Sequence, residues 1–187
     1  MRYLEANRQE ILITIGLTAV FLWCIAALGI WGFHLPLIPL KLNYYHVVIG
    51  FSLGLCISLL SLFFHRSVSL FRESADLNMI KIVAPLKYQD LIWLGILPGL
   101  SEELLFRGIL LPTIGLNWLG ITISSLIFGI LHLSQPRYYL YALWAILVGV
   151  VFALAILITH NLLTVVLAHI TTNILSACLW KSHFHQT

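Results

Sequence analysis

The sequence predicts an all-α membrane protein, a polytopic bundle of about six transmembrane helices with both termini in the cytoplasm. Of its 187 residues, 60% are hydrophobic and 9% are charged, whereas soluble domains carry about 25% charged residues. Six apolar runs each approach the length of about 20 residues that crosses a bilayer. We therefore expect residues 1–187 to form a single integral membrane domain, with the lipid bilayer as its surroundings.

The apolar runs can be followed in order along the chain. The first, Ile11–Trp31, is longer than the hydrophobic part of a signal peptide and is expected to remain as the first helix. The second, Tyr44–Phe64, contains Gly50 and Gly54, which either form a close helix contact or are ordinary membrane glycines. In the polar stretch that follows, Leu77–Val83 is expected to lie along the membrane surface. The other four runs are Leu91–Leu111, Leu116–Leu133, Tyr138–Ile158 and Leu162–Trp180.

Positive charges predict the orientation of these helices. With the N-terminus inside, the outer loops hold only Lys41, which is a strong positive-inside bias. The sequence contains no basic patch with interleaved aromatic residues, so we expect no nucleic-acid partner. The residues assigned to the cytoplasmic side are Arg2, Arg8, Arg66, Arg72, Lys81, Lys87, Arg137 and Lys181. The three cysteines lie scattered in apolar runs and fit neither a disulfide framework nor a zinc site; they are Cys24, Cys56 and Cys178.

The stretch PGLSEELLFRG, residues 98–108, carries the charged residues that lie well inside a long apolar run, Glu102, Glu103 and Arg107. A charge at the centre of a membrane helix costs about 2.5–3.5 kcal/mol, so such residues indicate a functional site. Glu103 and Arg107 are spaced to form an ion pair on one helix face. Glu102 points elsewhere without a local partner, and we therefore expect it to do the chemistry. A buried ion pair beside one stray carboxylate is the alternative.

Pro98 and Gly99 interrupt this third run. We expect the pair to kink the helix or to start a new one, with Ser101 as its N-cap.

Further polar residues lie in the fourth and sixth runs. Phe128 and His132 are four residues apart, as are His169 and Asn173, so each pair shares a helix face. Glu102 in an apolar pocket is suited to activate water with the help of His132. His169 and Asn173 can stabilise the oxyanion that forms when water attacks an amide carbonyl. These residues predict a peptide-hydrolysis centre without a cofactor.

A metal version of the site uses the same residues. Glu102, His132 and His169 would supply three ligands and leave the fourth position open, as in catalytic zinc sites. We favour the metal-free site, because the sequence has no HExxH motif and Asn173 is an unusual ligand for zinc.

Three motifs occur in order on successive membrane segments: EExxxR in SEELLFRG, FxxxH in FGILH and HxxxN in HITTN. Over about Leu91–Leu179 the chain resembles the CPBP family of CAAX proteases and bacteriocin-processing enzymes, also called the Abi family. The resemblance implies an intramembrane endopeptidase of the glutamate type, formerly classed among the metallopeptidases, in which Glu102 activates water. His132, His169 and Asn173 match the other active-site positions. Phe128, Glu103 and Arg107 match the rest of the motifs.

Two other functions fit the same residues less well. Intramembrane Glu and His residues also mark proton or ion pathways, but the chain shows no internal repeat. A non-catalytic bacteriocin-immunity or scaffolding protein on the same fold is the other alternative. The expected partner is a membrane-associated peptide or protein, such as a prenylated CAAX tail, a leader peptide or a regulator. The small size favours a bacterial plasma membrane.

The expected depths of the candidate residues disagree. Glu102 lies about 17 Å into its run at 1.5 Å per residue, and His169 lies at a similar depth. His132 is near the cytoplasmic end of its run. Either the fourth run extends as a helix beyond Leu133, or a kink at Pro98 brings Glu102 nearer to the cytoplasm.

Overall fold

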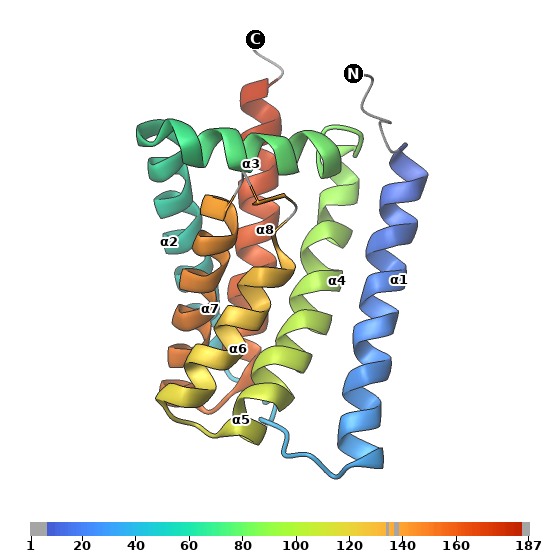
Figure 1. Ribbon diagram of the computed structural model, residues 1–187, viewed down its shortest axis with the longest axis vertical. Helices are drawn as coiled ribbons and strands as arrows, with labels where there is room; N and C mark the ends of the chain where they lie inside the picture. The colour runs from blue at the N-terminus through green and yellow to red at the C-terminus, as the bar shows by residue number, and fades with distance from the viewer. Residues whose placement is uncertain (1–6, 134, 137–138, 185–187) are drawn as a thin grey trace.

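The computed structural model describes residues 7–133, 135–136 and 139–184, and these residues form helices and the segments that join them. No β-strand occurs in these ranges, so the all-α prediction is confirmed. The helices stand side by side as a bundle, with α3 lying across one end (Figure 1). Their bounds are α1 Arg8–Ala27, η1 Leu28–Gly32, α2 Tyr44–Ser67, α3 Ser69–Ile82, η2 Tyr88–Asp90, α4 Leu91–Glu103, η3 Leu104–Leu110, α5 Leu111–Ile114, α6 Trp118–Leu131, α7 Tyr139–Thr159 and α8 Leu162–Phe184.

Among the described residues, four stretches are long and apolar enough to cross a membrane: residues 8–32, 44–67, 139–159 and 162–182. The third predicted span is helical from Leu91 to Ile114 but is divided among α4, η3 and α5. The fourth, α6, has only 14 residues.

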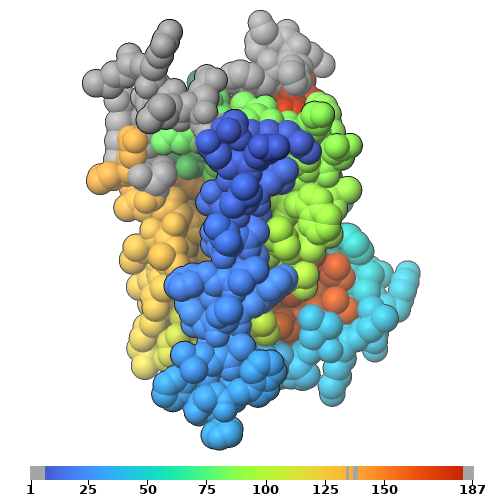
Figure 2. All heavy atoms as spheres, turned by 90° about the vertical axis from the view of Figure 1, so that its right-hand side faces the viewer, coloured from blue at the N-terminus to red at the C-terminus, as the bar shows by residue number. Residues whose placement is uncertain are grey.

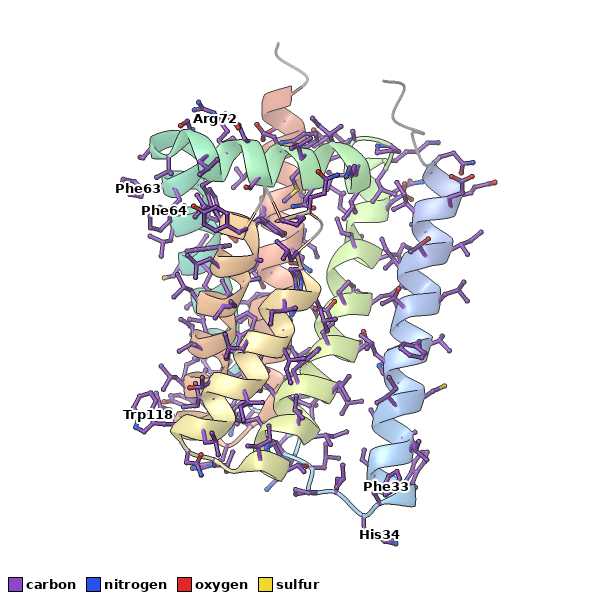
Figure 3. The ribbon with its side chains drawn as sticks, viewed as in Figure 1. Phe33, His34, Phe63, Phe64, Arg72 and Trp118 are labelled. Carbon is purple, nitrogen blue, oxygen red and sulfur yellow. The ribbon has the colours of Figure 1, made fainter. Side chains whose placement is uncertain are left out.

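Exposed aromatic side chains lie near both ends of the bundle, with Phe63 at one end and Phe33 and Trp118 at the other (Figure 3).

One end of the bundle collects most of the described positive charge. Helix α3 lies there, together with the first residues of α1 and α4 and the last residues of α2 and α8 (Figure 1). Lys41, in the connection between η1 and α2, lies at the opposite end. Arg2, Arg137 and Tyr138, the predicted start of the fifth span, are outside the described residues. The described positively charged residues at the first end are Arg8, Arg66, Arg72, Lys81, Lys87 and Lys181.

Helix α8 is the centre of the bundle, and α2 and α4 are the helices that pack most extensively on it. Helix α2 approaches α8 so closely that a Cβ atom at Gly50 would lie 2.7 Å from the Thr164 carbonyl oxygen. A Cβ atom at Gly54 would lie 2.6 Å from the Ala168 carbonyl oxygen. The two glycines therefore form the close helix contact that the sequence left open.

Helix α3 is held across the end of the bundle by polar contacts. Asp76 accepts a hydrogen bond from Trp180 Nε1 at 2.9 Å and lies 2.7 Å from His65 Nε2. At the other end of α3, Lys181 Nζ donates to the carbonyl oxygens of Val83 and Ala84. The helix begins at Ser69, eight residues before the predicted start at Leu77, because its N-terminal half also packs on the bundle through the buried Phe71.

Of the two alternatives at Pro98, a kink or a new helix, the new helix is wrong, because α4 runs through this residue to Glu103. Ser101 is not an N-cap, since its Oγ donates to the Leu97 carbonyl oxygen at 2.8 Å within the helix. The irregular turn comes later, in the π-helix η3. The Gly108 carbonyl oxygen in η3 accepts a hydrogen bond from the Ile38 N–H at 2.9 Å, which ties the chain after η1 to this turn.

The short length of α6 explains why the expected depths of Glu102 and His132 in the membrane disagreed. The helix ends at Leu131, so the fourth span does not extend beyond Leu133. A helix of 14 residues is about 21 Å long, and α6 therefore ends well inside the bundle, below α3 (Figure 1). His132 follows its last residue and thus lies deep, at the level of Glu102.

Helix α1 is the outermost element. It packs mainly on α4 and η3, and it lies in front of the green α4 segment in the view of Figure 2. Its buried positions, Ile11, Ala19 and Ala26, recur every seven or eight residues and define one narrow contact face. The other faces of α1 are open to the surroundings.

Replacing Gly54 by Ala should destabilise the protein, because the new methyl group meets the backbone of α8. Overpacking of this kind costs about 1–3 kcal/mol. Gly16→Ala is the matched control, since a Cβ atom at Gly16 meets nothing within 4 Å, and Ala in a helix is about 0.5–1 kcal/mol more favourable than Gly. Thermal unfolding in detergent should give a lower Tm for Gly54→Ala alone. Equal Tm values for the two variants would contradict the close contact.

The Arg8–Asp90 ion pair fastens the start of α1 to the start of α4, with Nε and Oδ2 2.6 Å apart. The hydrogen bond from Arg8, aided by the Lys87 N–H, lowers the pKa of Asp90 to about 2 from its ordinary 3.8. A lowered pKa means that this contribution to stability is complete above pH 3.8 and is lost as the pH falls through about 2. In acid unfolding between these values, Asp90→Asn should flatten the decline in Tm. An unchanged acid profile would show that the pair contributes nothing.

Candidate active site

The three motifs meet at Glu102. This residue lies near the C-terminal end of α4, His132 directly follows α6, and His169 lies in the first half of α8. Glu102 Oε2 is 4.0 Å from His132 Nε2 and 3.9 Å from His169 Nε2. Oε2 is buried and has no hydrogen-bond partner among the described residues. Residues separated by up to 67 positions in the sequence thus converge on one free carboxylate oxygen.

The neighbouring Glu103 is fully buried. Its Oε1 accepts a hydrogen bond from Arg107 Nη1 at 2.9 Å, so the predicted ion pair is present. The same oxygen accepts a hydrogen bond from His169 Nδ1 at 2.7 Å. Glu103 therefore orients a residue of the candidate site, in addition to pairing with Arg107. The sequence analysis missed this contact, although a carboxylate that orients a functional His is a common arrangement.

These contacts determine which nitrogen of each histidine faces Glu102. His132 Nδ1 lies 2.8 Å from the Phe128 carbonyl oxygen, which can only accept. His169 Nδ1 faces the Glu103 carboxylate, which is also an acceptor. Both Nδ1 atoms must therefore carry hydrogen. In the neutral rings, both Nε2 atoms then present a lone pair toward Glu102.

Arg107 is fully buried within aromatic rings. Its guanidinium carbon lies 4.2 Å from the Phe128 ring centroid and 5.5 Å from that of Phe152. Such cation–π contacts stabilise a desolvated cation. Phe128 also packs against the His132 ring, at a centroid distance of 4.6 Å. Phe128 thus connects the buried ion pair with the candidate site.

Asn173 is positioned by an indirect effect of Pro98. Because proline has no N–H, it leaves the carbonyl oxygen four residues earlier, that of Leu94, without its helical hydrogen bond. Asn173 Nδ2 donates to this oxygen across the α4–α8 contact at 3.5 Å, a long hydrogen bond. The proline therefore supplies a backbone acceptor for an α8 side chain. The second hydrogen of the Asn173 amide remains available.

A cavity of about 280 Å³ opens beside Glu102. Its walls come from α1, α2, α3, α4, α7 and α8 together with His132, and α3 covers it at the end of the bundle. Tyr141 and Trp144 of α7 also line it. The sequence analysis did not select them, because α7 carries no motif and ordinary membrane helices contain such residues. The polar lining residues include the motif residues Glu102, His132, His169 and Asn173 together with Ser101 and Tyr141; the others are Thr14, Thr18, Ser61, Asn78, Thr172 and Ser176.

The structure gives no support for a preformed metal site. In residues 7–133, 135–136 and 139–184, no group of three or more His, Cys, Asp or Glu side chains is arranged to hold a metal ion. The separations of 3.9 and 4.0 Å around Glu102 Oε2 exceed the distance of about 3.4 Å between two ligands bonded tetrahedrally to zinc at about 2.1 Å.

The geometry defines a helical membrane protein with a glutamate–histidine–histidine cluster beside a cavity. Comparison with family models agrees with this class: residues 85–175 match the family described as Rce1-like type II CAAX prenyl endopeptidases. The matched segment is just under half of the chain and contains all three motifs. This segment is therefore similar to that family, in agreement with the resemblance to CPBP proteases that the motifs predicted. Comparisons with curated proteins and with solved structures found no significant match.

The two adjacent glutamates should respond differently to the same substitution. Glu103→Gln leaves the buried Arg107 cation without its partner, and breaking a buried pair costs about 3–5 kcal/mol. Glu102→Gln removes a carboxylate whose Oε2 has no hydrogen-bond partner in the described chain, so the fold should keep its stability. Thermal unfolding in detergent should show a large fall in Tm for Glu103→Gln only. A similar fall for both variants would contradict the division between them.

Proposed function

We propose that the protein is an intramembrane endopeptidase in which Glu102 activates water to hydrolyse a peptide bond of a membrane-associated or lipidated substrate. The observation that carries this proposal is the unpartnered Glu102 Oε2, about 4 Å from the Nε2 atoms of His132 and His169, on a residue that lines a cavity. The match to a family of CAAX prenyl endopeptidases supports the peptidase class.

The hydrogen-bond acceptors of the site are suited to activate a water molecule. Glu102 Oε2 and His132 Nε2 are both acceptors, 4.0 Å apart, and one water molecule can donate a hydrogen bond to each. As the water oxygen attacks the carbonyl carbon, Glu102 takes its proton. The C–N bond then breaks, and this proton passes to the leaving amine. The products are a carboxylic acid and an amine, and Glu102 returns to its ionised form.

Stabilisation of the oxyanion is assigned to His169 and Asn173, with one condition on His169. Because its Nδ1 donates to Glu103, its Nε2 can donate only when the ring is a doubly protonated imidazolium. Two carboxylates are placed to interact with this cation, Glu103 in direct contact at 2.7 Å and Glu102 at 3.9 Å. Asn173 requires no change of protonation, since its amide always carries hydrogen.

The proposed topology has six crossings, formed by α1, α2, α4 with η3 and α5, α6, α7 and α8. Both termini then lie in the cytoplasm of a bacterium, and the site lies nearer to that side. The gathering of the described positive charges at one end of the bundle supports this orientation. The substrate reaches the cavity from the membrane. We also propose that no metal takes part.

Substitution of Glu102 tests the reaction. Purified protein in detergent is incubated with membrane-anchored and lipidated peptides, and cleavage is followed by mass spectrometry. Glu102→Gln should lower the rate by about 10²–10⁴-fold, the contribution of a general base. Chelator should leave the wild-type rate unchanged.

The control is Glu73→Gln, which removes an exposed carboxylate from α3 and should cleave at the wild-type rate. Full activity of Glu102→Gln would refute its role as the base. Loss of wild-type activity with chelator, restored by added zinc, would instead favour the metal site of Glu102, His132 and His169.

A further inference from the structure

The side-chain atoms that meet at Glu102 are hydrogen-bond acceptors rather than donors. Glu102 Oε2 and the two Nε2 atoms are acceptors while both histidines are neutral. Ser101 Oγ and Thr172 Oγ1 donate to carbonyl oxygens of their own helices. A substrate carbonyl that becomes negatively charged requires donors. Asn173 supplies one, and His169 supplies another only when it is protonated.

Tyr141 offers a further donor from α7. It lines the same cavity as Glu102 and His132, and its ring centroid is 6.5 Å from that of His132. The donor that it offers is its phenolic hydroxyl. Within the described part of the chain this hydroxyl has no hydrogen-bond partner. A tyrosine hydroxyl in a largely apolar site usually finds such a partner.

The orientation of Tyr141 is fixed by packing one turn further along α7. Trp144 also lines the cavity, and residues three apart share a helix face. The Trp144 ring packs edge-on against Phe64 of α2 at 5.5 Å and against Phe71 of α3 at 5.9 Å. This aromatic cluster sets the rotation of α7, so Tyr141 is held toward the site rather than toward lipid.

We propose that Tyr141 is a further catalytic residue, whose hydroxyl donates a hydrogen bond to the oxyanion of the tetrahedral intermediate. The inference rests on the proposed peptidase function. When water adds to the carbonyl carbon, the π electrons of the C=O bond move to its oxygen. Tyr141 stabilises this charge while keeping its own proton, and the intermediate then collapses with loss of the amine. Because the donor is neutral, it acts whether or not His169 is protonated.

Tyr141→Phe tests this role, because it removes the hydroxyl and keeps the ring. Loss of one oxyanion donor lowers kcat by about 10²–10³-fold, and KM should stay the same, since the hydrogen bond forms mainly in the transition state. Tyr139→Phe is the matched control. It makes the same substitution two residues away, at an exposed position outside the cavity.

A second readout separates catalysis from structure. A peptide with a phosphinate in place of the scissile amide mimics the tetrahedral intermediate. It should bind Tyr141→Phe more weakly by the same factor by which kcat falls. An uncleavable ground-state analogue should bind both forms equally. Tm values should be equal for the wild type and both variants.

The possible outcomes test the role of Tyr141 and the proposed peptidase function separately. If the wild type cleaves, Glu102→Gln does not, and Tyr141→Phe keeps full kcat, the role of Tyr141 is overturned and the peptidase stands. A raised KM with unchanged kcat would also overturn it, because the hydroxyl would then bind the ground state. If Glu102→Gln cleaves as well as the wild type, the proposed function fails and takes this inference with it.

Discussion

The arrangement of the site depends on one buried carboxylate oxygen, Glu103 Oε1, which accepts hydrogen bonds from Arg107 and His169 together. Burying a carboxylate and a guanidinium is expensive unless each is paired and enclosed. Here the cost is offset by their direct contact and by the rings around Arg107. The α4–η3 segment is thereby bound to α8. The same bond turns His169 so that its Nε2 faces Glu102.

Adjacent glutamates thus have opposite environments. Glu103 lies in the protein interior with two donors, while Glu102 lines a cavity and its Oε2 has no hydrogen-bond partner in the described chain. A π-helix starts directly after them, and such turns occur frequently at functional sites. Arg107 lies inside the π-helix, so the ion pair also connects the regular helix with the irregular turn.

Much of this could be predicted from the sequence because the information is local. Composition and run length indicate the helices, and the spacing of Glu103 and Arg107 indicates their pair. The contact between Glu103 and His169 joins residues 66 positions apart, and no local pattern encodes it. The new helix expected at Pro98 is absent for a related reason. Its freed Leu94 carbonyl is used by Asn173 from another helix, so a residue that normally ends a helix serves here as part of a contact between helices. Tyr141 could not be selected because its neighbours are known only from the fold.

The length of α6 has a consequence for the surrounding lipid. In the proposed topology this helix of 14 residues is about 21 Å long, whereas the hydrocarbon core of a bilayer is about 30 Å thick. A span that is too short draws the bilayer thinner around it. Water and lipid headgroups then come closer to His132 on the α6 side than elsewhere around the bundle. Acyl-chain length in the host membrane thus becomes a physical variable that sets how readily water reaches the site.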